Sequence, residues 1–166
     1  MIGYAIALAL AALPATPNPQ ADDKVAINTA LNKVYGAISG PVGAPRDWDA
    51  MRAMFTPDAR LYAAGKDGKL GGGTVQDYID RSGKLLIESG FTETALVNRI
   101  EAYGDVAQVW SSYEGRFTAD GKPKSVRGIN SFQLHRQATG EWKVHSILWQ
   151  SEHADLPLPP DMVAPK

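Results

Sequence analysis

Four polar side chains are predicted among aromatic residues on the inner faces of strands, and they are the first candidates for chemistry. These four residues are Ser111, Asn130, Ser146 and Gln150, and each is in phase with the apolar residues that alternate along its strand. A few hydroxyls and amides among aromatic walls are typical of a pocket for a small, flat ligand. Asn130 and Gln150 are the sharper candidates, because a buried carboxamide without partners costs about 1 to 3 kcal/mol.

Aromatic and apolar residues at helix and strand spacing complete the predicted wall of this pocket. Their side chains are expected on the same inner faces, as Tyr35, Trp48, Phe55, Tyr62, Tyr78, Tyr113, Phe132 and Leu148. Together with the four polar residues they form the predicted ligand-binding set. The alternative is that these side chains fill the core themselves, which would make the protein a structural or interaction module.

Catalysis by proton transfer would need a carboxylate base inside the pocket and a tyrosine or protonated acid that donates to a developing oxyanion. Tyrosines are present, whereas the expected places of most acids are helix exteriors, outer strand faces or turns. Glu152 is in phase with the inner face but lies at the rim. No catalytic residue is therefore assigned, and the sequence favours binding over turnover. An isomerase, dehydratase or cyclase that uses Tyr35, Tyr62 or Tyr113 with an acid such as Glu152 remains the alternative.

Other kinds of chemistry find less support. His135 and His145 are expected as diagonal neighbours on an outer face without an acidic partner, so neither a metal nor a cofactor is predicted. The absence of cysteine excludes disulfides and thiol catalysis. A net charge of -1, with basic and acidic residues intermixed, does not favour a nucleic-acid partner.

Helices and strands that could position these residues follow from the apolar periodicity. Helical spacing predicts three amphipathic helices, over residues 22–39, 47–55 and 74–89. A period of two predicts strands over residues 59–63, 92–103, 106–118 and two more within 125–152, while the glycine-rich residues 65–73 are expected as loop. Helices on one face of a strongly curved antiparallel sheet, an α+β cone, are the economical packing for this order.

The last two strands form a hairpin whose register decides which side chains face the core. A three-residue loop that ends in Gly140, extended without interruption, pairs Asn130 with Leu148. Under that register three apolar side chains point outward on a mainly polar face, namely Ile129, Ile147 and Trp149. They predict either a satellite cluster under a loop or the interface of a homodimer.

The domain boundaries come from the two ends of the chain. At 166 residues the chain is expected to form one domain, over residues 22–152. Residues 153–166 are proline-rich and are predicted to run extended over the surface.

Residues 1–21 carry no charged side chain and contain an apolar run that is too short to span a bilayer. This matches a secretory signal with Ala15 or Ala21 before the cleavage site, although a basic start is missing. We therefore expect a periplasmic or secreted protein. The alternative is an N-terminal extension of a cytoplasmic one.

Three segments resemble the nuclear transport factor 2-like superfamily, the cone-shaped fold shared with ketosteroid isomerase and polyketide-cyclase-like proteins. They are RDWDAMRAMFTPDA at 46–59, GDVAQVWSSYEG at 104–115 and GINSFQLHRQATGEWKVHSILWQSE at 128–152. The ending LWQSE, followed by PLPP, is similar to a bacterial subgroup named for lumazine binding. The resemblance implies a cone with a pocket at its open end, but this fold hosts many activities and implies no single reaction.

Overall fold

Three helices pack against one face of a bent sheet in the computed structural model, which describes residues 19–163. The chain begins with α1 (Pro19–Ile38), α2 (Trp48–Ala53), β1 (Phe55–Ala64), β2 (Leu70–Gly73) and α3 (Val75–Ser89). It continues with β3 (Thr92–Tyr103), β4 (Val106–Ala119), β5 (Lys122–Arg136), β6 (Trp142–Ser151) and the 3-10 turn η1 (Pro160–Met162).

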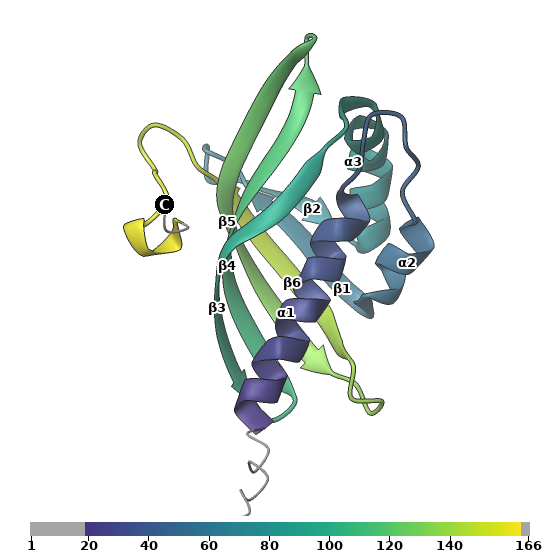
Figure 1. Ribbon diagram of the computed structural model, residues 1–166, viewed down its shortest axis with the longest axis vertical. Helices are drawn as coiled ribbons and strands as arrows, with labels where there is room; N and C mark the ends of the chain where they lie inside the picture. Colours follow the sequence, from purple (N-terminus) through teal and green to yellow (C-terminus); the bar gives the residue numbers. More distant parts are fainter. Residues whose placement is uncertain (1–18, 164–166) are drawn as a thin grey trace, which may run out of the picture.

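The sheet has the strand order β2-β1-β6-β5-β4-β3, and every neighbouring pair is antiparallel except β1 with β6. In Figure 1 it curves around α1, with α2 and α3 on the same side. The predicted α+β cone is confirmed. The long strands β3 to β6 form the wall on which the pocket residues lie.

The helices present apolar faces to the concave side of the sheet. Ile27, Leu31 and Val34 of α1 are buried there, as is Leu86 of α3. Thr74 starts α3 with a capping box, and Gly90 ends it in the left-handed conformation at φ 63°. These caps fix the ends of the helix that forms one side of the cone.

Arg46 is a buried cation that ties the ends of α1 and α3 together. Its guanidinium donates hydrogen bonds to the carbonyl oxygens of Ile38 (3.2 Å) and Leu86 (3.2 Å), which belong to the last turns of these helices. It also donates to the carbonyl of Gly40 at 2.8 Å. The carbonyl ends of helices attract cations, so this one side chain holds both helices at the same edge of the cone.

The glycine-rich segment is partly a strand, and the prediction of loop throughout 65–73 was wrong. β2 pairs with the end of β1, so that Gly72 lies opposite Tyr62. A Cβ atom on Gly72 would collide with the carbonyl oxygen of Leu61 and with Tyr62. Glycine therefore permits a close approach of two backbones here, which composition alone does not distinguish from a flexible loop.

A β-bulge in β6 changes the register that the sequence predicts for the last hairpin. Leu134 pairs with Val144 as expected, but Gln133 pairs with Ser146, so His145 is an extra residue. Beyond the bulge Asn130 lies opposite Trp149 rather than Leu148. Since side chains alternate between faces, this shift by one residue exchanges the inner and outer residues of the rest of β6.

A second bulge lies in β3, at Leu96. Ala95 pairs with Tyr113 and Val97 with Ser112, which leaves Leu96 without a partner in the ladder. The fully buried Ser112 hydroxyl accepts a hydrogen bond from the backbone N–H of Val97 at 3.1 Å. The bulge inverts the alternation of β3. Before it the odd-numbered residues face inward, and after it the even-numbered residues face inward.

The C-terminal tail folds back over the outer face of the sheet, on the side away from the helices (Figure 1). Leu158 and Met162 are buried, although the tail was predicted to run along the surface. The carboxylate of Glu152 binds Arg127 in two hydrogen bonds (2.8 and 3.0 Å) and accepts another from the N–H of Leu158 at 3.0 Å.

Among residues 19–163, no helix is long and apolar enough to cross a membrane. The same part of the chain brings no three metal-ligating side chains together.

Candidate functional site

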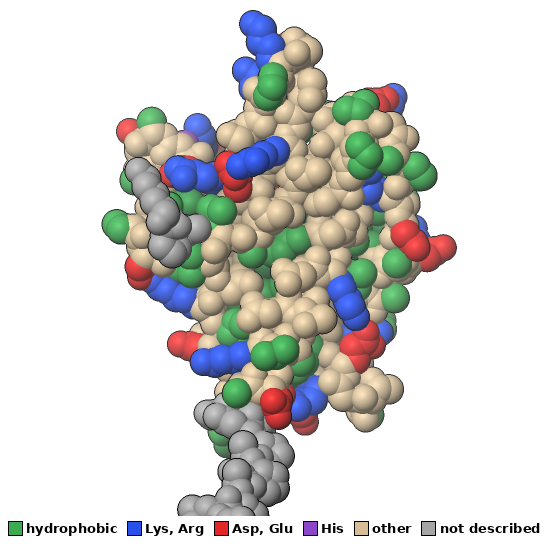
Figure 2. Space-filling model, in the orientation of Figure 1, with side chains coloured by type: hydrophobic (Ala, Val, Ile, Leu, Met, Phe, Trp, Pro, Cys, Tyr) green, Lys and Arg blue, Asp and Glu red, His purple; other side chains and the backbone are tan. Residues whose placement is uncertain are grey.

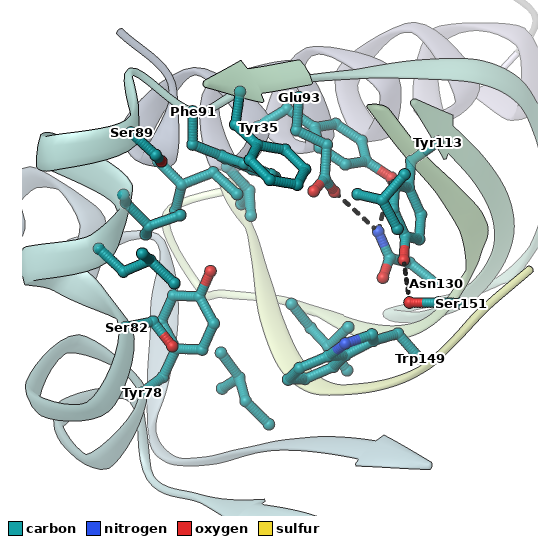
Figure 3. Close-up of a pocket in the computed structure, with 18 of the residues that line it drawn as sticks. Tyr35, Tyr78, Ser82, Ser89, Phe91, Glu93, Tyr113, Asn130, Trp149 and Ser151 are labelled. Atoms are coloured by element: carbon teal, nitrogen blue, oxygen red, sulfur yellow. Dashed lines mark hydrogen bonds between the residues drawn. The ribbon is translucent and has the colours of Figure 1, made fainter. Parts of the chain in front are cut away.

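A cavity of about 350 Å³ lies between the concave face of the sheet and helices α1 and α3 (Figure 3). Its wall is mainly apolar and includes Leu61, Phe91, Val126 and Ile147. At one rim are Leu85 of α3 and the residues Phe117 to Ala119 at the end of β4. Its volume is within the range of small-molecule sites.

A chain of hydrogen-bonded polar groups crosses the sheet side of the cavity. The hydroxyls of Tyr35 and Ser111 share a hydrogen bond of 2.7 Å beneath α1. The side-chain amide of Asn130 donates to the Tyr35 hydroxyl at 3.1 Å and to Oε1 of Glu93 at 3.2 Å. Burial raises the pKa of Tyr35, so its hydroxyl keeps its proton at neutral pH.

Glu93 is a carboxylic acid that faces the cavity from the start of β3 (Figure 3). Burial raises its pKa from 4.5 to about 7, while the hydrogen bond from Asn130 acts in the opposite direction. Ser39, just after α1, fixes the backbone of Glu93: its hydroxyl accepts a hydrogen bond from the Glu93 N–H at 2.8 Å and donates to the carbonyl of Tyr35 at 2.7 Å. The acid is thus held on rigid elements beside Tyr35.

Aromatic groups lie across the cavity from Glu93. In Figure 3 the hydroxyl of Tyr78 points into the cavity from α3, and it has no hydrogen-bond partner within residues 19–163. Its ring meets the Trp149 ring edge to face at 6.2 Å. Burial raises the pKa of Tyr78, and nearby Glu93 adds to that effect. Tyr78 therefore remains a proton donor that a ligand in the cavity can reach.

Half of the predicted ligand-binding residues line the cavity. They are Tyr35, Phe55, Tyr78, Tyr113, Asn130 and Phe132. The Tyr113 hydroxyl hydrogen-bonds to Ser151 at 3.3 Å, and Tyr35 stacks edge to face on Phe132 at 6.0 Å.

The other half of that set lies elsewhere. Trp48 packs on Gly83 of α3, and Ser111 is covered by Tyr35, to which it is hydrogen-bonded. Tyr62 alternates with the inward Leu61 of β1 and lies over Gly72. The bulge in β6 turns the remaining three residues, Ser146, Leu148 and Gln150, to the outer face of the sheet. There Leu148 and Gln150 line a groove of about 310 Å³ under the C-terminal tail.

The same bulge corrects the predicted outer apolar group. The side chains of Ile147 and Trp149 line the cavity, so their predicted outward orientation was wrong. Ile129 does lie on the outer side, in the groove under the tail.

Glu93 is the residue that sequence reasoning missed. Extending the alternation of Asn98 and Ile100 backwards places Glu93 outside, and only the bulge at Leu96 brings it inside. Glu152, the acid considered instead, has a lowered pKa because the Leu158 N–H and Arg127 stabilise its carboxylate. One signal was present for the bulge in β6, because Val144 and Ile147 break the strict alternation of apolar residues.

The cone, the cavity at its open end and the order of elements define a nuclear transport factor 2-like fold. No family model and no curated protein sequence matches this chain. It is similar to a Mycobacterium tuberculosis protein of unknown function, at 17% identity and a TM-score of 0.67, over 86% of this chain and 80% of that chain.

Two further solved structures are also similar. One is a nuclear transport factor 2-like protein of unknown function from Shewanella baltica, at 23% identity and a TM-score of 0.54, over 81% of this chain and 97% of that one. The other is a candidate ketosteroid isomerase from Shewanella frigidimarina, at 18% identity and a TM-score of 0.54, over 75% of this chain and 94% of that one. These likenesses define the fold and leave the reaction open.

Proposed function

We propose that this protein binds a small, mainly apolar carbonyl compound in the cone cavity and moves a proton on it with Glu93. The observation that supports this proposal most is that the carboxyl group of Glu93 lies in an apolar cavity, where burial raises its pKa to about 7. A group that exchanges its proton near neutral pH serves as a base when ionised and as an acid when neutral. Isolated buried acids are unfavourable, so their presence in a cavity favours a chemical role.

The groups around Glu93 support proton transfer next to a carbonyl. The Glu93 carboxylate would remove a proton from the carbon beside the carbonyl, and the resulting oxyanion would accept a hydrogen bond from Tyr78. In a carbonyl compound with a double bond between its β and γ carbons, the product of this step is a dienolate, and return of the proton from Glu93 to the γ carbon would move the double bond next to the carbonyl and complete an isomerisation. The apolar wall strengthens these interactions once a bound ligand has displaced water from the cavity, because charges are then poorly screened.

Binding without turnover is the second candidate, favoured from the sequence because no inward acid was recognised. Glu93 removes that argument, although the carboxyl could also accept a hydrogen bond from a ligand. A filled structural module is disfavoured by a cavity of about 350 Å³. Lumazine, the flat ligand named by the resembling subgroup, belongs in the first set of compounds tested for binding.

Deuterium exchange separates turnover from binding. Cyclohexanone in D₂O exchanges the protons beside its carbonyl, and proton NMR follows the loss. We expect the protein to accelerate this exchange, with a rate that rises through about pH 7 as Glu93 ionises. Glu93→Gln should lower the rate by roughly 10² to 10⁴. Glu101→Gln, on the exposed side of the same strand, should leave it unchanged.

Two results decide against the proposal in different ways. Saturable cyclohexanone binding without accelerated exchange would leave a binding protein. Equal acceleration by the wild type and Glu93→Gln would show that another group is the base.

Export and dimerisation remain proposals from the sequence. The expected signal lies almost entirely outside the described residues, and the mass of the N-terminal peptide from protein made in its native host tests cleavage. A homodimer would use the outer sheet face, where Trp110 and Leu148 are 46% and 45% exposed. Sedimentation of Trp110→Glu against the wild type tests that contact, since a dimer through this face should dissociate.

A further inference from the structure

We propose that the cavity takes amphiphilic anions, whose apolar body enters the cone while the acidic head group binds Lys122 and Lys124 at the mouth. This inference rests on the proposed ligand pocket and adds the class of compound that it takes. It begins from the hairpin of β4 and β5. β3 accompanies β4 only as far as the pair Thr92 and Arg116, so residues 117–124 form a two-stranded ribbon, which projects at the top of Figure 1.

The strand register places both lysines on the side of the ribbon that borders the cavity. Lys122 pairs with Ala119, and Lys124 pairs with Phe117. Residues directly opposite each other in an antiparallel pair project from the same face. Phe117 and Ala119 line the cavity rim, so the two lysine side chains leave the ribbon on the face next to the mouth.

These two cations are available to a ligand. Both residues are exposed, and neither ammonium group forms an ion pair with a carboxylate of residues 19–163. Glu88, in the last turn of α3, is paired with Lys84 at 3.7 Å, while Asp120 lies in the turn between the two strands. Figure 2 shows Lys and Arg side chains gathered at the projecting end of the molecule.

The interior of the cavity determines the orientation of such a ligand. Among residues 19–163, no lysine, arginine or histidine lines the cavity, and Glu93 is the one carboxyl group that does. An anionic group placed deep in the cone would lose its hydration, find no cation and face that acid. At the mouth it would keep contact with water and approach two ammonium groups. An amphiphile with one acidic end therefore fits with its head outward.

Octanoate and 1-octanol are matched probes, because they share an eight-carbon chain length and differ in the charged head. Their affinities for the full chain are measured by isothermal titration calorimetry at low and high salt. In Lys122→Gln/Lys124→Gln we expect octanoate to bind about 3- to 10-fold more weakly, from the modest strength of exposed charge pairs. The affinity for 1-octanol should change less than about twofold.

A matched control removes two lysines near the other end of the molecule, Lys24 and Lys143. Lys24→Gln/Lys143→Gln lowers the net charge equally, and it should change octanoate binding less than about twofold because distant charges are screened. High salt should remove most of the difference between wild type and Lys122→Gln/Lys124→Gln.

Failure of this inference is distinct from failure of the pocket. If 1-octanol binds while both lysine pairs affect octanoate equally, or neither does, the head-group site is wrong and the pocket stands. If 1-octanol binds and octanoate does not, the preference for anions is wrong as well. If neither probe binds, the ligand pocket itself is wrong and this inference falls with it.

Discussion

Replacing Glu93 by glutamine should remove a specific pH dependence from the stability of the fold. The folded protein holds the Glu93 proton more tightly than the unfolded chain does, because burial raises the pKa from 4.5 to about 7. The stability that this group contributes is therefore fully present below pH 4.5 and is lost as the pH rises through about 7. Glutamine keeps the shape of the side chain and cannot ionise.

The size of the effect follows from the pKa shift. One pKa unit corresponds to about 1.36 kcal/mol, so the shift of Glu93 sets an upper value of about 3 kcal/mol. Part of the carboxyl surface faces the cavity, where water stabilises the ionised form. We therefore expect wild type to lose about 2 to 3 kcal/mol relative to Glu93→Gln between pH 4.5 and a pH above 7.

Urea unfolding of wild type and Glu93→Gln over this pH range measures the difference between their free energies of unfolding. The titration of all other groups cancels in that difference. Glu101→Gln is the control, because its side chain lies on the exposed side of β3. Its pH profile should run parallel to that of the wild type. Parallel profiles for Glu93→Gln and wild type would refute the assignment of a raised pKa to this acid.

Three further substitutions test the wall of the cavity. Asn130→Leu removes the hydrogen bond that lowers the pKa of Glu93, so NMR titration should give a higher value than in wild type, and unfolding should cost about 1 to 3 kcal/mol less. Trp149→Glu should destabilise the fold by about 3 kcal/mol in urea without changing the sedimentation mass of the folded protein, since the ring faces the cavity. Gly128→Ala places a Cβ atom against the backbone of β6, at the carbonyl oxygen of Gln150 and the Cα of Ser151, and 2.7 Å from the Tyr113 hydroxyl, so the end of β6 should shift in a crystal structure and the stability should fall by about 3 kcal/mol or more.

The fold was predictable because its elements carry strong local patterns. The apolar stripe through Ile27, Leu31 and Val34 predicts α1. The strand predicted over 92–103 has the same bounds as β3, and the turn at Gly104 separates it from β4. These signals depend on residues that are close in the sequence, so they can be recognised without knowing how the elements pack.

Much of the candidate site was not predictable, because it depends on two irregular positions. The extra residue His145 moves Trp149 into the cavity and Gln150 out of it. The unpaired Leu96 brings Glu93 to the inner face. A bulge is stabilised by contacts across strands, such as the bond from the Val97 N–H to Ser112, and these have no signature within one strand. Residues on strands without an extra residue, such as Tyr113 of β4, were placed on the correct face, because the alternation of side chains continues along the whole strand.

The central claim is that Glu93 and a ligand share one apolar cavity. Carbon-13 NMR of the glutamate side-chain carboxyls, with Glu93 assigned by its loss in Glu93→Gln, tests this claim most directly when the titration is repeated with 1-octanol. We predict a pKa of about 7 in the free protein and a further rise when octanol displaces water from the cavity. A pKa close to 4.5, or one that saturating octanol leaves unchanged, would contradict the account.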